Sequence, residues 1–262
     1  MTILPSAGNP LMSKWVQGKL VGKKRWTDRL VSIEIAAPEV TFVAGQFARL
    51  GLPAPPGSKE EIIGRPYSFV NPPGVPQHEF FFNVLPEGPL SPRLAVLEAD
   101  DPVFMLPNAN GFFTMAEVPE AEALWCISTG TGIGPFLSIL RTAAPWEKFT
   151  RVVLVHAVRV AADLAYRDVI DGVVHQHHGA FTYVPVVSRE AHPDALPGRI
   201  PALIPDGRLE SRAGQALTAS SAHVMLCGNP AMVDDVQAVL AKRGMKRHRR
   251  REPGQITLET YW

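Results

Sequence analysis

The sequence lacks several features that would assign it to a particular class of protein. It has only two cysteines, Cys126 and Cys227, so it cannot form a disulfide framework, and a reducing compartment is expected. No stretch approaches the ~18 apolar residues of a membrane helix, and no basic segment precedes an apolar stretch at the start, as a secretory signal would need. We therefore expect a soluble, cytoplasmic protein with no membrane contact.

Net charge is also nearly absent, because 26 Lys and Arg residues oppose 25 Asp and Glu residues. This balance argues against a nucleic-acid binder that works by bulk charge. The cancellation is global and not local: residues 242–251 hold seven Lys and Arg and no acid, whereas residues 87–122 hold seven Asp and Glu and one Arg. Such local fields can guide a charged partner.

Proline and glycine are plentiful instead, with 25 and 21 residues, and the apolar fraction of 46% indicates a globular chain. Residues 1–13 resemble a loose extension. From residue 14 to about residue 116, short strand-like runs lie between turn signals such as Asn71-Pro72-Pro73-Gly74. Val31, Ile33 and Ile35 alternate with other residues as in a half-buried strand. This pattern predicts a small antiparallel β-barrel over residues 14–116 with one short helix, capped by Ser91.

From about residue 121 onward the pattern changes to apolar strands that alternate with helices. Residues 124–128, 151–157, 181–187 and 224–227 are expected strands, and residues 135–142 and 162–177 are expected helices. A third expected helix begins at Asn229-Pro230, with Asn229 as its cap, and ends at Gly244. Alternation of this kind predicts a doubly wound α/β domain with a parallel sheet over residues 121–262. The expected architecture is thus a β-barrel domain followed by an α/β domain.

The turn Thr129-Gly130-Thr131-Gly132-Ile133-Gly134-Pro135 follows a strand and opens a helix. Glycines let the backbone approach a pyrophosphate closely, and the helix N-terminus offers free N–H groups. The motif departs from the G-x-G-x-x-G pattern because Pro135 occupies the last position. Taken alone, it indicates either a nucleotide-binding turn or a tight structural turn.

Three further clusters combine residue types that suit a flat, phosphorylated ligand. Arg65-Pro66-Tyr67-Ser68 offers a phosphate partner, an aromatic ring and a hydroxyl, and Gly88-Pro89-Leu90-Ser91 precedes a helix. Cys227-Gly228-Asn229-Pro230 stands at a strand end, where open α/β sheets bind ligands. The chain ends in Glu259-Thr260-Tyr261-Trp262, and two terminal aromatic residues suggest burial against a core or a planar cofactor. Taken alone, the Arg65 and Cys227 clusters could instead be packed strands without a ligand, and the aromatic chain end could pack into a domain core.

These clusters, in this order, resemble the ferredoxin–NADP reductase family over residues 14–262, and the Tyr-Trp ending is similar to its bacterial members. The resemblance implies a barrel that binds FAD and an α/β domain that binds NADP. It implies an oxidoreductase that transfers electrons between NADPH and the one-electron carriers ferredoxin or flavodoxin. A related flavin reductase that serves an oxygenase or uses NADH is the alternative, and a non-catalytic nucleotide-binding module is a third reading.

For FAD, the resemblance implies contacts from both halves of the chain. Arg65 would hold the pyrophosphate, Tyr67 would stack on one face of the isoalloxazine ring, and Tyr261 would cover the opposite face. The full set implied is Arg65, Pro66, Tyr67, Ser68, Phe81, Phe82, Asn83, Val84, Pro89, Leu90, Ser91, Thr131, Tyr261 and Trp262.

Catalytic roles are implied for Ser68, at the reactive edge of the flavin, and for Cys227 and Glu259, beside the nicotinamide. The nicotinamide nucleotide would contact Thr129, Gly130, Thr131, Gly132, Val158, Arg159, Ser188, Arg189, Arg199, Cys227 and Gly228. A 2′-phosphate needs cations, whereas NAD enzymes place an acid on the ribose. Arg159, Arg189 and Arg199 all follow expected strand ends, so the sequence favours NADP.

Two remaining features have simpler explanations. His175-Gln176-His177-His178 lies at an expected helix end, where cations suit the helix dipole, and we expect no metal there. The basic run of residues 246–251 suits an acidic electron carrier better than a nucleic acid, and Lys23, Lys24 and Arg25 could extend that surface. A solvated loop is the alternative. No segment indicates an oligomer interface, so a monomer is expected.

Overall fold

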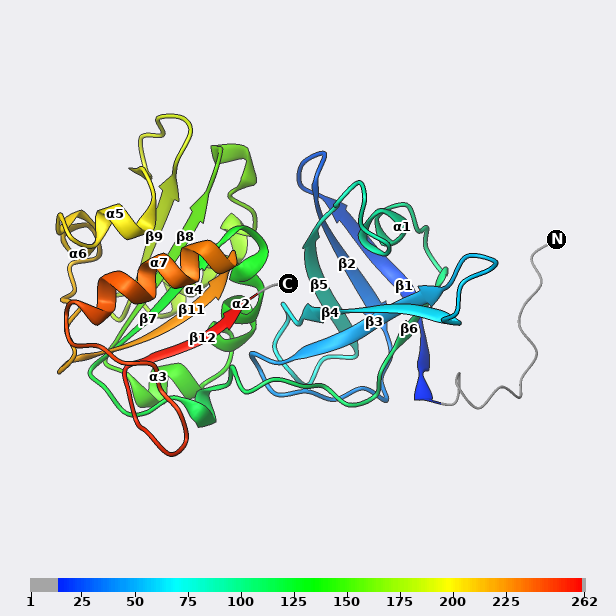
Figure 1. The fold of residues 1–262 in the computed structure, drawn as a ribbon, viewed down its shortest axis with the longest axis horizontal. Helices are drawn as coiled ribbons and strands as arrows, with labels where there is room; N and C mark the ends of the chain where they lie inside the picture. Colours follow the sequence, from blue (N-terminus) through cyan, green and yellow to red (C-terminus); the bar gives the residue numbers. More distant parts are fainter. Residues whose placement is uncertain (1–13, 261–262) are drawn as a thin grey trace. The chain divides into compact units, whose positions relative to one another are not determined.

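The structure is a computed structural model that describes residues 14–260 (Figure 1). The chain divides into two compact units, with the boundary between Gly111 and Phe112. The expected domain limits, residues 116 and 121, lie a few residues further along the chain. Among the described residues, no helix is both long enough and apolar enough to cross a membrane.

The first unit contains one six-stranded antiparallel sheet in the order β4-β3-β6-β1-β2-β5. A β-bridge between Phe69, directly after β4, and Phe80 in β5 joins the two outer strands. The sheet is therefore closed, and the predicted antiparallel barrel is confirmed. Its elements are β1 (Val16–Arg25), β2 (Leu30–Ala36), β3 (Phe47–Pro53), β4 (Ile62–Ser68), β5 (Gln77–Asn83), α1 (Ser91–Ala95) and β6 (Pro102–Met105).

Strand β2 shows how the barrel core forms. Val31, Ile33 and Ile35 are all buried, as their alternation predicts, and they join the main cluster of the barrel. The intervening Ser32 is also buried, because the indole Nε1 of Trp26 donates a hydrogen bond to its hydroxyl at 3.0 Å. The prediction of a half-buried strand is therefore confirmed at Glu34, which is exposed, and wrong at Ser32, whose hydroxyl is satisfied by another side chain.

The second unit contains a six-stranded sheet in the order β10-β9-β8-β7-β11-β12, and all its pairs are parallel. The chain winds outward from β7 to β10 and then returns to place β11 on the other side of β7. The strand order therefore reverses between β7 and β11, and such a switch point is where open α/β sheets bind ligands. The strands are β7 (Ala123–Thr129), β8 (Arg151–Val158), β9 (Phe181–Val187), β10 (Leu196–Pro197), β11 (Ala222–Gly228) and β12 (Ile256–Thr260).

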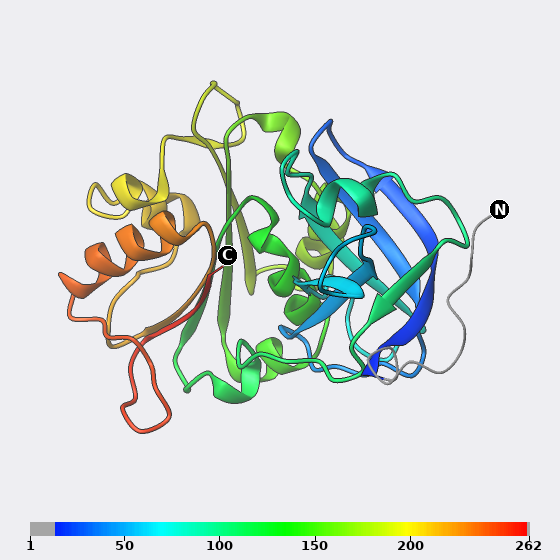
Figure 2. The same ribbon diagram turned by 45° about the vertical axis from the view of Figure 1, so that its right-hand side comes forward.

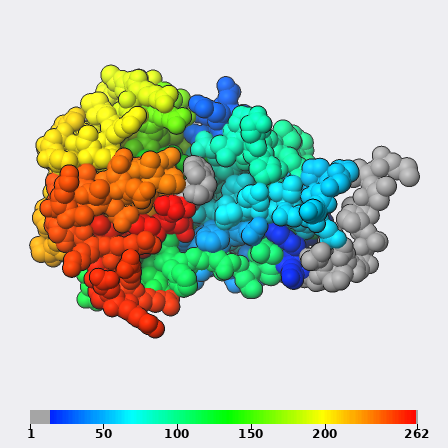
Figure 3. Space-filling view, viewed as in Figure 1, coloured from blue at the N-terminus to red at the C-terminus, as the bar shows by residue number. Residues whose placement is uncertain are grey.

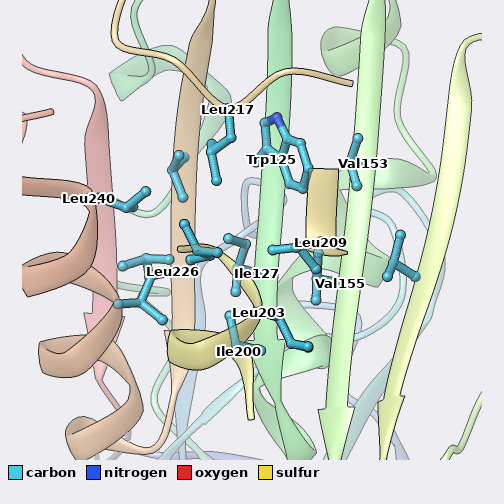
Figure 4. Close-up of a cluster of buried hydrophobic side chains, with 14 of the residues drawn as sticks. Trp125, Ile127, Val153, Val155, Ile200, Leu203, Leu209, Leu217, Leu226 and Leu240 are labelled. Carbon is cyan, nitrogen blue, oxygen red and sulfur yellow. The ribbon is translucent and has the colours of Figure 1, made fainter. Parts of the chain in front are cut away.

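Helices cover this sheet and bury its apolar residues. Trp125 and Ile127 of β7 face Leu203, Leu209 and other side chains of the covering helices in one continuous cluster (Figure 4). The α-helices are α2 (Gly134–Leu140), α3 (Ala144–Lys148), α4 (Arg167–Gln176), α5 (Ile200–Leu203), α6 (Arg208–Ala213) and α7 (Pro230–Ala241). The 3-10 turns are η2 (Met115–Glu117), η3 (Gly130–Ile133) and η4 (Ala161–Asp163). The predicted doubly wound parallel fold is confirmed.

Helix α4 begins at Arg167, so the predicted helix over residues 162–177 was wrong in its first turn. A short 3-10 turn, η4, is followed by three residues without regular structure, and Tyr166 has a left-handed backbone with φ of 61°. The side chain of Leu164 packs against Val158 and Val187 in a small buried cluster. Packing of this loop against the ends of two strands therefore overrides the local helix propensity.

Candidate functional site

The turn over residues 129–135 lies at the switch point of the parallel sheet and packs directly against the loop after β11. A Cβ atom on Gly132 would stand 2.5 Å from the carbonyl oxygen of Cys227, closer than such contacts occur. Gly228 has a φ of 137° and presses against Thr129, so it also tolerates no side chain. The structure thus brings two of the sequence motifs together, through glycines that allow the close approach.

Hydrogen bonds fix the same two loops. The hydroxyl of Thr129 accepts the backbone N–H of Asn229 at 3.0 Å. The side chain of Asn229 in turn accepts the N–H of Ala231 at 3.0 Å, which caps α7 as the sequence predicts. The arrangement leaves a turn with left-handed Gly130, φ 53°, at the start of a helix, a geometry that suits a phosphate group.

A buried histidine that the sequence reasoning missed supports this turn. The ring Nε2 of His156, in β8, donates to the carbonyl oxygen of Gly130 at 3.1 Å. Burial lowers the pKa of His156 to about 4, so the ring is neutral near pH 7 and Nε2 carries its proton. The sequence feature that could have indicated this residue is a histidine inside the otherwise apolar run of β8.

Cys227 and Glu259, the implied catalytic pair, are direct neighbours across β11 and β12. Cys227 is fully buried and Glu259 is half-buried. Ser128 of β7 lies on the other side of Cys227 in the register, so three polar residues form one row near the carboxyl edge of the sheet. Tyr261 and Trp262, assigned to the flavin from the sequence, lie outside the described residues.

The loops after β8 and β9, coloured green to yellow, extend from one edge of the sheet (Figure 2). The arginines expected to bind a 2′-phosphate directly follow β8, β9 and β10, which are neighbours in the sheet, and therefore lie at the same carboxyl edge. Arg159, Arg189 and Arg199 are all exposed. None of them forms an ion pair with another residue in the described range 14–260. Three unpaired guanidinium groups on adjacent loops provide a site for an anion. Val158 and Ser188, the other residues expected there, form the base of the two loops.

In the first unit, Arg65 and Tyr67 lie two residues apart in β4 and therefore on one face of the strand. Arg65 is exposed, and among the described residues its guanidinium donates only to the carbonyl of its neighbour Gly64, at 2.8 Å. The ring of Tyr67 contacts Phe82 edge-on, with 5.5 Å between ring centres. Burial raises the pKa of the Tyr67 phenol, so it stays protonated. Pro66 is exposed and Ser68 is buried.

The segments around β5 and α1 hold the other residues expected at the flavin. Phe81 and Phe82 are buried, Asn83 and Val84 are half-buried, Pro89 is exposed, and Leu90 belongs to the barrel core. Ser91 does not cap α1, contrary to prediction. Its hydroxyl accepts the backbone N–H of Leu85 at 3.0 Å, because the turn before α1 folds back onto the helix start.

The basic run of residues 246–251 lies elsewhere, at the amino edge of the sheet, in the loop that joins α7 to β12 (Figures 1 and 3). Arg250 donates to both carboxylate oxygens of Glu117, at 2.6 and 3.0 Å, and lies over the ring of Phe112. The oppositely charged segments recognised in the sequence therefore neutralise each other in part. The Glu117 partner holds the pKa of Arg250 above its usual value.

The remaining sequence candidates have structural partners. Lys23 contacts the carbonyl of Leu97 and the carboxylate of Glu98, and Lys24 lies 3.6 Å from the centre of the Trp26 ring. His177 stacks on Trp146 with 3.6 Å between ring centres. Over residues 14–260, no group of three or more His, Cys, Asp or Glu side chains is placed to hold a metal.

Comparison with known proteins gives consistent results over nearly the whole chain. A family model described as the oxidoreductase NAD-binding domain matches residues 126–238. A flavodoxin/ferredoxin–NADP reductase from Escherichia coli is 46% identical over 252 residues, covering 96% of this chain and all of the relative. A ferredoxin–NADP reductase from Pseudomonas aeruginosa is 32% identical, covering 95% of this chain and 98% of the relative.

A solved structure resembles the whole chain as well. The ferredoxin NADP+ reductase from Neisseria gonorrhoeae superposes with a TM-score of 0.88 at 34% identity, and the comparison covers 94% of this chain and 98% of the other. That crystal structure contains bound FAD and NADP. Both units of the present chain are therefore represented in a related enzyme.

Proposed function

The chain belongs to the flavodoxin/ferredoxin–NADP reductase family, and on this premise we propose that it is an FAD-dependent oxidoreductase that transfers electrons between NADPH and ferredoxin or flavodoxin. The observation that carries the proposal is 46% identity with a flavodoxin/ferredoxin–NADP reductase along its full length. A shared fold alone would not be sufficient, because one fold can host several chemistries.

The residues of the barrel suit FAD. Arg65 is an exposed cation without an acidic partner among the described residues, and it shares a strand face with the neutral ring of Tyr67. A guanidinium can pair with the pyrophosphate and a phenol ring can stack on the isoalloxazine, so these two groups suit the cofactor. Pro66, Asn83, Val84 and Pro89 would complete the pocket, with backbone groups from Phe81, Phe82, Leu90 and Ser91.

Bound FAD supplies the chemistry that links a two-electron donor to a one-electron carrier. The protein's task is to position the two partners and to manage protons. We assign Ser68 to the reactive edge of the flavin. Cys227 and Glu259, which are neighbours across β11 and β12, would line the nicotinamide side. The thiol would form an apolar wall, and the carboxylate would hold a proton. Thr131 would lie between the two cofactors, and Trp262 would add contacts to FAD.

The terminal Tyr261 would cover the flavin face that the nicotinamide must reach, so it would have to move during turnover. This role is inferred from the aromatic chain end. Removing Tyr261 and Trp262 should therefore change both the KM for NADPH and kcat. Unchanged kinetics of the shortened enzyme would contradict a gating role.

The carboxyl edge of the α/β unit suits NADP(H). Its turn over residues 129–132 would hold the pyrophosphate, and Gly228 allows the loop after β11 to pack closely against Thr129 at the start of this turn. The unpaired Arg159, Arg189 and Arg199 would hold the 2′-phosphate, with Ser188 at the base of the loop. Since no acidic side chain is ion-paired with these arginines in residues 14–260, the site favours the phosphorylated nucleotide over NADH.

The basic run of residues 246–251 is the proposed contact for an acidic electron carrier. Lys246, Arg247 and Arg251 are exposed and have no ion-pair partner among the described residues. Charge reversal at Lys246 and Arg247 should raise the KM for the carrier at low salt, and the difference from wild type should shrink at high salt. An unchanged KM at both salt concentrations would show that the loop is only solvated.

We further propose that the enzyme acts as a monomer in the cytoplasm. Both cysteines are free thiols and both are buried, which suits a reducing compartment.

Steady-state assays with NADPH and NADH, each paired with ferredoxin and with flavodoxin, test the proposed function. We expect activity with NADPH and at least one carrier, and a much lower kcat/KM with NADH. Activity confined to NADH, or to free flavin and an oxygenase, would favour the alternative of a related flavin reductase.

A further inference from the structure

The loops that follow β8 and β9 stay paired beyond the end of the sheet. Ser188 donates to the carbonyl oxygen of Val158 through its backbone N–H at 3.1 Å and its hydroxyl at 3.2 Å. One residue further on, the N–H of Arg189 donates to the carbonyl oxygen of Arg159 at 2.9 Å. The backbones that carry two of the phosphate-binding arginines are therefore joined to each other.

The carboxylate of Glu190 forms a further link between the two loops. Oε1 of Glu190 accepts the backbone N–H of Ala161 at 2.5 Å. Ala161 is the first residue of η4, and an amide at that position has no partner within the helix. Below this contact, the buried side chains of Val158 and Val187 pack with Leu164. The two loops are thus held by a polar link at the surface and an apolar cluster beneath it.

The position of Glu190 is unusual for an acid, because it directly follows Arg189 at a site proposed to bind a dianionic phosphate. A free carboxylate there would repel the phosphate and would offer an acceptor for the 2′-hydroxyl of NADH. In this structure one carboxylate oxygen of Glu190 already accepts the amide N–H of Ala161. The link therefore both orders the loops and restrains the group that would favour the wrong nucleotide.

We propose that Glu190 is a positioning residue that sets the preference for NADP(H), by tying the loop of Arg159 to the loop of Arg189 through the amide of Ala161. The inference rests on the proposed function, since it assumes that these arginines bind the 2′-phosphate. It requires no contact between Glu190 and the nucleotide.

The test compares Glu190→Ala, Glu190→Gln and a control, Glu120→Ala, which removes an exposed acid just before β7 at the opposite edge of the sheet. Calorimetry on the full-length, FAD-loaded protein measures the Kd for 2′,5′-ADP and for 5′-ADP. Steady-state assays measure KM and kcat with NADPH and NADH. The two ADP probes report on the site without turnover.

For Glu190→Ala we expect the Kd for 2′,5′-ADP and the KM for NADPH to rise about tenfold, the scale of one lost hydrogen bond to a charged group. The Kd for 5′-ADP, the KM for NADH and kcat should stay within about twofold of the wild-type values, because 5′-ADP and NADH have no 2′-phosphate and so do not make the contacts that are weakened. Glu190→Gln should remain near wild type, since its amide oxygen can still accept the N–H of Ala161. Glu120→Ala should also match wild type.

Parallel losses with both nucleotides, or a Gln variant as weak as the Ala variant, would overturn the role of Glu190. Retention of full 2′,5′-ADP affinity by Glu190→Ala would do so as well. A wild-type protein that binds 2′,5′-ADP no better than 5′-ADP would contradict the proposed function itself. The two failures are therefore distinguishable.

Discussion

The two edges of the parallel sheet differ in how many of their arginines form ion pairs. At the carboxyl edge, Arg159, Arg189 and Arg199 are exposed and lack ion-pair partners among the described residues. At the amino edge, Arg249 and Arg250 are paired with Glu252 and Glu117. The longer run of positive charge in the sequence is thus partly neutralised, whereas the three arginines of the proposed 2′-phosphate site, spread over 41 positions, are all without ion-pair partners among the described residues.

The density of positive charge along the sequence therefore does not by itself identify the proposed 2′-phosphate site. Exposed ion pairs contribute little to stability and reduce the field available to a partner. Unpaired guanidinium groups on neighbouring loops keep their full hydrogen-bonding capacity for a phosphate. The edges should therefore respond differently to equivalent substitutions.

The largest difference is expected for arginine removal. Replacing both Arg159 and Arg189 with alanine should raise the KM for NADPH about 100-fold, because each guanidinium–phosphate hydrogen bond contributes roughly 1.5–3 kcal/mol. The KM for NADH should change little, as should both values for the amino-edge control Arg250→Ala. Equal losses with NADPH and NADH would remove the distinction between the edges.

Two glycines of the α/β unit, Gly132 and Gly172, should differ in how their replacement changes the free energy of unfolding. Gly132→Ala should lower the free energy of unfolding by about 1–3 kcal/mol, since the new Cβ would overlap the Cys227 carbonyl and force a backbone shift. Gly172→Ala, in an exposed part of α4 with open space around it, is the matched control and should stabilise by up to about 1 kcal/mol. Denaturant titrations measure both, and an unaffected Gly132→Ala would contradict the tight packing of the turn.

One buried histidine lies toward each edge, His156 in β8 and His223 in β11. Burial lowers their pKa values from 6.5 to about 4 and about 3. The unfolded chain therefore binds protons first, so stability is present above pH 6.5 and declines as pH falls toward 4. Each histidine contributes at most about 1.4 kcal/mol per pH unit.

Unfolding titrations between pH 7 and pH 4 measure this decline, and His156→Gln or His223→Gln should each make it shallower. Only His156→Gln should also weaken NADPH binding, because only His156 supports the turn at Gly130. A wild-type stability that does not change over this pH range would contradict the neutral buried rings.

The smallest effect is expected for the pair of Glu117 and Arg250. Both side chains are near the surface, so Glu117→Gln should leave the thermal midpoint and the KM for NADPH unchanged within error. Calorimetric scans of the single and double variants measure the coupling. A clear loss of stability would show that this pair holds the amino edge together.

The sequence predicted the architecture well because its signals are local. Apolar runs such as the one in β8, the glycine turn after β7 and the Asn229 cap each identify an element from neighbouring residues. The same local logic placed Cys227 at a strand end, where the sheet now brings Glu259 beside it.

The features it did not predict depend on partners far apart in the chain. Arg250 and Glu117 are separated by 133 positions, and Glu190 meets an amide 29 positions away. The helix expected from residue 162 is interrupted because Leu164 packs on strand ends, which exist only in the folded unit. The bond of Ser91 to Leu85, in place of capping its own helix, is a local exception that depends on how the turn before α1 folds.

An anaerobic titration of the purified protein with NADPH and, in parallel, with NADH tests most directly whether the chain is an FAD-dependent NADPH oxidoreductase. We expect a yellow protein whose flavin absorbance is bleached by one equivalent of NADPH, far less readily by NADH, and is restored by oxidised ferredoxin or flavodoxin. A colourless protein without FAD, or a flavin that NADPH does not reduce, would contradict this expectation.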